Sequence, residues 1–504
     1  MAIAQNDIIY FILTDRFYGK PNSAILQGID RNDPFAFHGG NIDGIIDKIP
    51  YLKNLGITAL WITPVYLQMQ SPRIKAQPYH GYWTLDFNTV DPHLYIDNGR
   101  YPAGSKLYVK DLADRLHENG IKLILDMVVN HVGYDHPGRT NSEPNPTPIR
   151  AHWFNQPGLD CNQDVIEGEL AGLPDMDLDQ LDVIDYHINT IASWIKETGI
   201  DCIRMDTAKH VERGFWNYFK TQIRGRFPDI ALIGEALVYD IDDLTNYQKF
   251  WGFDSLFDFP VQQAMEKVFI YGAGMTLFHS PFDMGAGIFE KDSMYSNHNR
   301  LVSLLDNHDL PGRFITIARD HFLNDLKMAA DILKLALTFM FTTRGIPQIY
   351  YGTEIGMEGR ADPDNRKDFM WEKIGPDNGV IPEYALEKEI FDHTKKLNRL
   401  RREHEALYSG ILVCLYVDYF LMVCLSYSFD SVAITVIHNG TLPMSDYVNV
   451  EIEPNMKIPS RIKNKLRNEA LVCQLTGESV KITDGSFSIK MNRKSSFVLM
   501  ESNS

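Results

Sequence analysis

Eight short apolar runs, separated by longer segments with helical periodicity, constrain the fold of this chain more than any other feature. Most runs are rich in Ile, Leu and Val without polar alternation, which is typical of parallel strands covered on both faces. Gly120 and Gly199 each follow a helical segment, where a C-cap is expected. Eight βα units predict a (β/α)8 barrel. The expected strands are Ile8–Leu13, Thr58–Ile62, Lys122–Met127, Cys202–Met205, Ala231–Gly234, Leu256–Phe259, Leu301–Leu305 and Pro347–Tyr351, with helices at 105–119, 183–198, 214–224 and 325–341.

Two regions depart from this alternation. The segment after His131 holds no strong helix but many Pro, Asn and Asp residues, and it is too long for a simple connection. After about Glu403 the chain changes to short β-like runs, with turn signals at Asn439-Gly440 and Asp484-Gly485. We therefore assign residues 1–131 and 183–402 to the barrel, 132–182 to an inserted domain and 403–504 to a C-terminal antiparallel β-sandwich. The β-like runs are Gly410–Val417, Tyr419–Ser428, Val432–His438 and Ser496–Glu501.

Charge and composition exclude several classes of protein. The net charge of −17 argues against a nucleic-acid or anionic-membrane partner, because both favour basic surfaces. Five widely spaced cysteines without a CxxC pair argue against a disulfide framework or a zinc site. No secretory signal and no apolar run of membrane-spanning length stand out, so a cytoplasmic location is expected unless a signal has been removed. The sequence leaves the oligomeric state open.

Four of the predicted strands lead directly into charged residues. Barrels of this kind carry their catalytic groups at the carboxyl ends of strands. Glycosidic-bond cleavage needs two carboxyl groups; in a retaining mechanism one attacks and the other protonates the leaving oxygen. Arg204 precedes Asp206 by two residues, so it faces the same side and favours an ionised nucleophile. Glu235 follows an apolar run, which suits a carboxyl group that must carry a proton. The acids at these strand ends are Asp126, Asp206, Glu235 and Asp309.

An ordered set of motifs covers most of residues 1–400. It comprises Ile9-Tyr-Phe-Ile-Leu-Thr-Asp-Arg-Phe17, Tyr79-His-Gly-Tyr-Trp83, Asp126-Met-Val-Val-Asn-His131, Leu173-Pro-Asp-Met-Asp177, Arg204-Met-Asp206, Ile233-Gly-Glu-Ala236, Asp306-Asn-His-Asp309, Gly345-Ile-Pro-Gln-Ile-Tyr-Tyr-Gly352 and Asp362-Pro-Asp-Asn-Arg366. The set resembles the α-amylase family of glycoside hydrolases (family 13), and its motifs are closest to those of fungal-type α-amylases. One motif alone would be weak evidence, whereas the ordered set is specific.

The resemblance implies a role for each matching residue. Asp206 matches the nucleophile, Glu235 the general acid/base, and Asp309 a third carboxylate that grips the sugar ring. Asp126 matches a supporting, hydrogen-bonding residue. The expected substrate-binding residues are Arg204, which orients the nucleophile, His131 and His308 at the reacting glucose, Tyr82 beneath its ring, Lys209 and His210 on the leaving-group side, and the pair Asp362 and Arg366.

Several of these residues have a plainer alternative. His131 and His308 could be satisfied core histidines. Tyr82 could be a packing aromatic, and for Trp83 packing is at least as good an interpretation. Lys209 could be a solvated charge at a helix start.

Calcium is the cofactor that the resemblance implies. The matching positions are Asn130, Asp175 and the main-chain carbonyl of His210, and oxygen ligands of this kind suit calcium. A fourth ligand would come from the inserted domain, where the candidates are Asp160, Asp164 and Glu167. The alternative is that these polar groups bond one another without a metal.

The expected function is hydrolysis of α-1,4 bonds in starch, glycogen or maltooligosaccharides. A cyclomaltodextrinase, neopullulanase or 4-α-glucanotransferase with the same site is the alternative, since the Thr-Asp-Arg-Phe start and the Asp-Pro-Asp-Asn-Arg segment also resemble cyclodextrin glucanotransferases. The sequence shows neither an extra N-terminal domain nor an appended starch-binding module. A non-catalytic binding relative is the remote alternative, and it predicts the loss of catalytic acids that are all present.

Overall fold

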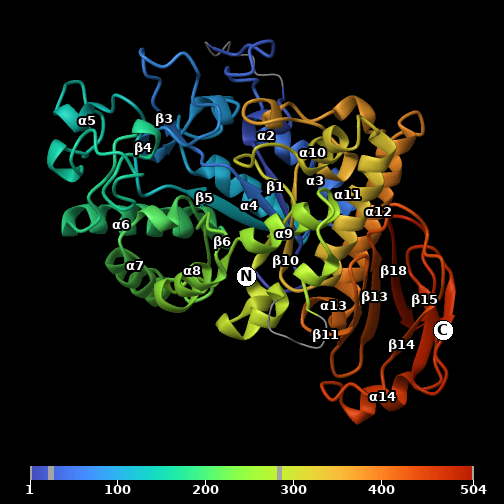
Figure 1. The fold of residues 1–504 in the computed structure, drawn as a ribbon. Coiled ribbons are helices and arrows are strands. Elements are labelled where there is room, and N and C mark those ends of the chain that lie inside the picture. Colours follow the sequence, from blue (N-terminus) through green and yellow to red (C-terminus); the bar gives the residue numbers. More distant parts are fainter. Residues whose placement is uncertain (1–2, 21–27, 281–286, 502–504) are drawn as a thin grey trace.

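The computed structural model describes residues 3–20, 28–280 and 287–501. Figure 1 shows a central barrel with a small lobe on one side and a β-rich domain at the C-terminal end. The barrel is an eight-stranded parallel sheet in the order β8-β7-β6-β5-β2-β1-β10-β9, and a bridge between Phe257 and Val302 links its two edge strands. Its strands are β1 (Ile9–Ile12), β2 (Ala59–Ile62), β5 (Lys122–Met127), β6 (Cys202–Met205), β7 (Ala231–Gly234), β8 (Ser255–Leu256), β9 (Val302–Leu304) and β10 (Ile346–Tyr350).

The predicted barrel is confirmed, with a strand at each of the eight apolar runs. One boundary was wrong, because Phe259 opens helix α9 (Phe259–Phe269) instead of ending a strand. The Asp258 side chain accepts a hydrogen bond from Val261 N, and Pro260 occupies the first turn, so the chain enters the helix directly after β8.

Helices surround the barrel in alternation with the strands (Figure 1). Each of the four predicted helices is present, with bounds that differ from the prediction by at most two residues. The longer helices are α2 (Ile42–Asp47), α3 (Ile49–Leu55), α4 (Leu107–Glu118), α6 (Leu181–Thr198), α7 (Arg213–Arg226), α8 (Ile241–Asn246), α9, α10 (Phe314–His321), α11 (Leu326–Thr342), α12 (Ala385–Glu403) and, in the C-terminal region, α14 (Ser460–Leu466). The shorter ones are α1 (Thr14–Phe17), α5 (Pro137–Thr140) and α13 (Glu405–Tyr408).

The small lobe combines an unpredicted hairpin with the inserted segment. The hairpin pairs β3 (Tyr66–Gln68) with β4 (Thr84–Val90) and lies within the range assigned to the barrel. The inserted segment contains α5 and two 3-10 helices, Ala151–Trp153 and Leu170–Gly172, and is otherwise mostly turns and irregular chain, as its Pro, Asn and Asp content predicts. Isolated bridges, including that between His131 and Asp175, tie the two ends of this segment together.

The C-terminal region forms two antiparallel sheets. One has the order β11-β12-β13-β18-β15-β16, and the other pairs β14 with β17. Along β12, Met422 and Cys424 belong to the barrel's apolar cluster, whereas Val423 and Leu425 pack in the cluster that includes the β14–β17 sheet. Both faces are therefore covered, which explains the continuous apolar runs. The strands are β11 (Ile411–Val417), β12 (Leu421–Tyr427), β13 (Val432–His438), β14 (Val448–Glu451), β15 (Ala470–Cys473), β16 (Ser479–Lys481), β17 (Ser486–Ile489) and β18 (Ser495–Glu501).

All five cysteines are free thiols. Across the described ranges, every helix is too short or too polar to cross a bilayer.

Candidate active site

Arg204 is the hub of the site. It lies on β6 with its side chain fully buried, and its guanidinium contacts carboxylates from the ends of three neighbouring strands. Nη1 donates to Asp126 Oδ1 and to Asp206 Oδ1, both at 2.7 Å. Nη2 lies 2.8 Å from Glu235 Oε1, as an ion pair without hydrogen-bond geometry. The parallel order β5-β6-β7 thus gathers three acids at one mouth of the barrel.

Asp126 is enclosed by donors on both of its oxygens. Oδ1 accepts from Arg204, while Oδ2 accepts from Trp61 Nε1 at 3.1 Å and from the Tyr82 hydroxyl at 2.8 Å. Burial raises the pKa of Asp126 to about 6 against the opposing effect of Arg204. These contacts suit a residue that holds Arg204 and Tyr82 in place, since Asp126 is absent from the cleft lining.

The charge balance of the cluster favours a bound proton. Burial raises the pKa of Asp206 well above its ordinary value; Arg204 lowers it, and the nearby Glu235 and Asp126 raise it further. The sequence predicted the Arg204 contact but not this direction, because the other two acids converge only in the fold. With three carboxyl groups around one guanidinium, full ionisation would place three negative charges against one positive charge.

Neutral rings form one wall of the cleft. Tyr82 and His308 stack with centroids 5.4 Å apart and an interplanar angle of 17°. His131 Nε2 donates to the Tyr82 carbonyl at 3.2 Å. Burial lowers the pKa of His131 to about 4 and that of His308 well below its usual range. Both imidazoles are therefore uncharged at neutral pH and can exchange hydrogen bonds with sugar hydroxyls.

Asp309 lies at the more open side of the site. Its side chain is 35% exposed, compared with 8% for Asp206 and 9% for Glu235. Arg366 Nη2 lies 3.2 Å from Asp309 Oδ1, and Arg366 Nε lies 3.3 Å from Asp362 Oδ1. Arg366 therefore ties the loop after β9 to the loop after β10.

A cleft of about 450 Å³ brings the predicted residues together. Arg204 lies beneath it and reaches it through the carboxylates. Trp83, for which packing was an equal alternative, also lines the cleft. The predicted residues in the lining are Tyr82, His131, Asp206, Lys209, His210, Glu235, His308, Asp309, Asp362 and Arg366.

Lys209 and His210 connect the cleft to neighbouring loops. Both lie on a short 3-10 turn, Ala208–His210, directly after β6. Lys209 Nζ donates to the Leu237 carbonyl at 3.2 Å, and His210 Nδ1 donates to the Val165 carbonyl at 2.9 Å. His210 thereby holds the inserted segment against the barrel.

The inserted segment adds an apolar wall that the sequence analysis missed. Tyr134, Leu170 and Leu173 line the cleft, and the Tyr134 ring meets Trp83 edge to face at 5.0 Å. The Tyr134 hydroxyl donates to the Ala171 carbonyl at 2.9 Å. The one available signal in the sequence was the presence of a few apolar residues in an otherwise polar segment. That signal did not indicate whether their side chains face the cleft. Ala171, His80, Thr207 and Leu237 complete the missed part of the lining.

Two of the three predicted calcium ligands, Asn130 and Asp175, bond each other. Asp175 Oδ1 accepts from Asn130 Nδ2, and Asp175 Oδ2 accepts from Asn155 Nδ2, both at 2.8 Å. Asp160 and Asp164 accept hydrogen bonds within their own turns. In the described part of the chain, no three His, Cys, Asp or Glu side chains converge as a metal-binding group. Calcium therefore stays a prediction from the resemblance and enters no step below.

Fold and site together define a (β/α)8-barrel protein with a carboxylate cleft, the equipment of a glycoside hydrolase. A family model described as "Alpha amylase, catalytic domain" matches residues 11–169 and 161–410. The chain therefore belongs to the α-amylase family.

Individual relatives extend this result. A β/α-amylase of Paenibacillus polymyxa is 31% identical over 96% of this chain and 37% of its own length. A cyclomaltodextrinase of Thermoanaerobacter pseudethanolicus is 31% identical over 81% of this chain and 66% of its own length. The chain thus spans less than two thirds of the length of either relative. A solved α-amylase from Geobacillus thermoleovorans, complexed with acarbose, is 30% identical with a TM-score of 0.81 over 100% of both chains.

Sequence identity does not distinguish a fungal α-amylase from the bacterial relatives. The α-amylase mde5 of Schizosaccharomyces pombe is 30% identical over 78% of this chain and 70% of its own length, against 31% for the two bacterial relatives above.

Proposed function

We propose that this protein is a retaining glycoside hydrolase that cleaves α-1,4-glucosidic bonds in starch, glycogen or maltooligosaccharides. The observation that carries the proposal is the Arg204 guanidinium, which contacts Asp126, Asp206 and Glu235 at the floor of the cleft. The acarbose bound by the Geobacillus thermoleovorans α-amylase supports a carbohydrate substrate for this cleft.

In the first step, the proton that the carboxyl cluster holds lies on Glu235, and a carboxylate oxygen of the ionised Asp206 attacks the anomeric carbon. Arg204 holds Asp206 Oδ1, so Oδ2 is the oxygen free to attack. Glu235 donates its proton to the glycosidic oxygen as the bond from that oxygen to the anomeric carbon breaks. The products of this step are the released reducing-end fragment, which carries a new hydroxyl group, and a glycosyl ester that holds the non-reducing fragment on Asp206.

In the second step, Glu235 takes a proton from a water molecule that attacks the same carbon. The ester bond breaks, Asp206 leaves as a carboxylate, and Glu235 regains its proton. Two inversions at the anomeric carbon retain its configuration. Neutral His131 and His308 and the Tyr82 ring position the sugar, while Asp309 binds its hydroxyls near Arg366.

A cyclodextrin-acting or transglycosylating enzyme is the second candidate. It is favoured by relatives named cyclomaltodextrinase and by the solved glucanotransferase CldA, which is 26% identical with a TM-score of 0.80 over 98% of this chain and 99% of its own. The chemistry is the same until a sugar hydroxyl replaces water in the second step. A non-catalytic relative is disfavoured because Asp206, Glu235 and Asp309 all line the cleft.

The deciding experiment is a product profile on soluble starch, pullulan, maltoheptaose and β-cyclodextrin, with and without a calcium chelator. Shorter linear products from starch support the hydrolase, whereas products longer than a maltoheptaose donor support transfer. Loss of activity or of thermal stability in the chelator, restored by added calcium, would support the calcium prediction. Proton NMR of fresh product tests the mechanism, and a β-anomer from an α-glucan would contradict retention.

We predict that Asp206→Asn lowers kcat by several orders of magnitude, because an amide cannot form the glycosyl ester. Steady-state kinetics on maltoheptaose measure the effect, and far-UV circular dichroism verifies folding. Asp254→Asn is the control, since this acid pairs with Arg224 away from the cleft. Near-normal turnover by Asp206→Asn would remove Asp206 from its proposed role.

A further inference from the structure

A second hollow lies beside the loops that border the cleft. Its volume is about 460 Å³, and its lining includes Tyr271, Pro311, Ile317, Asp320, His321 and Arg360. These residues come from the segment after α9, the loop after β9, helix α10 and the loop after β10. None of them belongs to the cleft lining described above.

Two hydrogen-bonded loops form a shared rim between the hollow and the cleft. Gly312 and Arg360 form an antiparallel bridge, and Arg313 N donates to the Gly359 carbonyl at 2.8 Å. Asp309, just before this bridge along the chain, lines the cleft, while Pro311 and Gly312 line the hollow. In the second loop Asp362 lines the cleft and the adjacent Ala361 lines the hollow. The two sites are therefore separated by only a thin rim of main chain.

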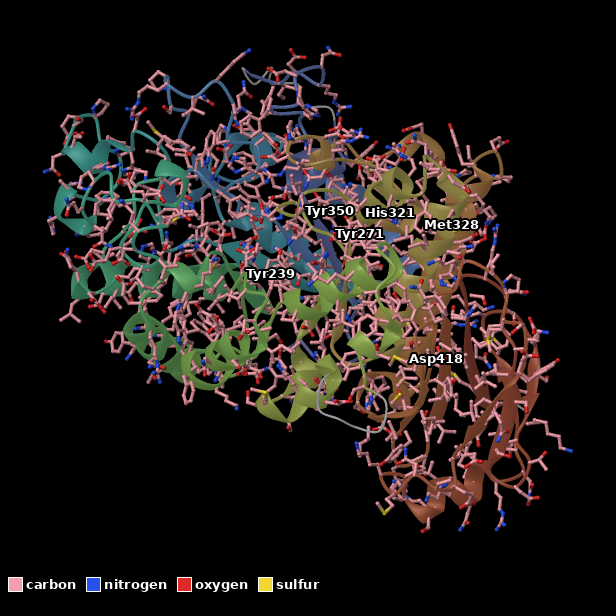
Figure 2. The ribbon with its side chains drawn as sticks, viewed as in Figure 1. Tyr239, Tyr271, His321, Met328, Tyr350 and Asp418 are labelled. Carbon is pink, nitrogen blue, oxygen red and sulfur yellow. The ribbon has the colours of Figure 1, made fainter. Side chains whose placement is uncertain are left out.

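The hollow presents an aromatic pair to solvent. Tyr271 is 54% exposed, and the His321 ring meets it edge to face at 5.3 Å with an interplanar angle of 90°. Figure 2 shows the two side chains next to each other on the viewed face. Together with Pro311 and Ile317, they offer apolar surface to a flat ligand. The C–H faces of a pyranose ring provide such a surface.

Charged groups lie beside this apolar surface. Arg360 Nη2 donates to Asp320 Oδ2 at 2.8 Å. Asp320 Oδ1 also accepts from Arg319 Nε and Nη2, at 3.2 and 2.8 Å, so the Asp320 carboxylate serves mainly to orient Arg360. A guanidinium carries five N–H donors, and the Arg360 side chain, which is 66% exposed, has donors left for the oxygens of sugar hydroxyls. An apolar surface with a few convergent polar groups is the usual composition of a small-molecule site.

We propose that this hollow is a second α-glucan site, which holds a neighbouring part of a long polymer while the cleft cleaves it. The inference rests on the proposed function, because it takes the same substrate class. A polymer that spans both sites binds more tightly than either site alone would allow, since the second contact is intramolecular. A short oligosaccharide fills only the cleft. The hollow therefore sets a preference for long chains and leaves the chemistry unchanged.

The test is affinity electrophoresis through gels that contain amylopectin, with a Glu235→Gln background to prevent digestion. Tyr271→Ala and His321→Ala should each weaken amylopectin binding by about 5- to 10-fold. In the catalytically intact protein the same variants should keep kcat/KM on maltotriose within about twofold and lose severalfold on amylopectin. Tyr218→Ala is the matched control, because Tyr218 is 43% exposed on α7 and lies outside the hollow.

The outcomes separate the two proposals. Unchanged amylopectin binding by Tyr271→Ala and His321→Ala, with normal maltotriose cleavage, would overturn the second site and leave the proposed function standing. An equal loss in Tyr218→Ala would also overturn it. Absence of cleavage on every α-glucan by the unmodified protein would overturn the proposed function and the second site together. Thermal melting curves of each variant verify that binding changes do not come from unfolding.

Discussion

At the scale of single residues, Arg204 alone supplies the positive charge that compensates three buried carboxyl groups. One planar guanidinium reaches two carboxylates through Nη1 and a third through Nη2. A lysine ammonium at the same place would be a compact charge on a flexible stem, without the fixed fork. Arg204 is fully buried, so its charge and those of Asp126, Asp206 and Glu235 depend on one another.

We predict that Arg204→Lys lowers kcat by about 100-fold or more and destabilises the fold by about 3 kcal/mol, because buried carboxylates lose part of their compensation. Maltoheptaose kinetics and urea unfolding measure the two effects. Arg224→Lys is the control, because Arg224 forms a more exposed pair with Asp254. An Arg204→Lys protein as active as the unmodified one would contradict the proposed role of Arg204 in holding the three carboxyl groups.

His187 is a buried titratable residue away from the site. It lies on α6, with its ring edge-on to Phe87 at 5.1 Å and to Tyr186 at 5.4 Å. Among the described residues its Nε2 has no hydrogen-bond partner, and burial lowers its pKa to about 3. The unfolded chain takes up this proton near pH 6.5 and the folded chain only near pH 3. Its contribution to stability is therefore present above pH 6.5 and is lost as the pH falls toward 3.

We predict that His187→Gln reduces the loss of stability between pH 7.5 and 5.5 by roughly 1 kcal/mol, since glutamine does not titrate in this range. Urea unfolding at both pH values measures the difference. Asn189→Gln is the control, because it changes an exposed and non-titrating side chain on the same helix and should leave the pH dependence unchanged. An identical pH dependence in His187→Gln would show that this histidine is not responsible.

At the scale of elements, two glycines on successive helices have opposite effects on stability. Gly199 ends α6 with a φ of 72°, in the left-handed region, and the chain turns there into β6. Gly225 lies within α7, is exposed, and has no atom within 4 Å of an added Cβ. The left-handed backbone at Gly199 favours glycine. At Gly225, glycine only lowers the helix propensity of α7.

We predict that Gly199→Ala lowers the free energy of unfolding by about 1 kcal/mol and that Gly225→Ala raises it by about 0.5 kcal/mol. Both substitutions add one methyl group, so each serves as the control for the other. Chemical denaturation under identical conditions gives the two values. The same sign of change in both variants would refute the assignment of the helix cap.

At the scale of the whole molecule, the barrel and the C-terminal sheets share a core. Met422, Cys424 and Ile437 pack in the barrel's apolar cluster, although their strands belong to the C-terminal sheet. Leu400 and Leu407 from α12 and α13 pack with other residues of that sheet. Contacts of this kind should make the two parts unfold together.

We predict a single calorimetric unfolding transition and a loss of about 2–4 kcal/mol in Ile437→Ala, because the cavity opens in the shared core. Ile411→Ala is the matched control; Ile411 is 58% exposed on β11 of the same sheet, so its change should stay within about 0.5 kcal/mol. Two separate transitions in the unmodified protein would contradict shared cooperativity.

The sequence alone determined the barrel and the acids at its mouth. Strand positions follow from local apolar runs, and a side chain just past a parallel strand lies at the mouth whichever barrel forms. Local pattern also predicted β11, β12, β13 and β18 after residue 403, but it gave no range for β14 to β17. The β3–β4 hairpin escaped notice because β3 has only three residues and its register with β4 is irregular.

Only the tertiary structure decided which of these groups meet. Trp61 and Tyr82 bond Asp126 across 65 and 44 residues of chain, and Arg366 reaches Asp309 across 57. Such contacts depend on barrel closure and side-chain packing, which no local pattern contains. For the same reason, burial reversed the expected shift in the pKa of Asp206, and the hollow with Tyr271 emerged from four separate segments.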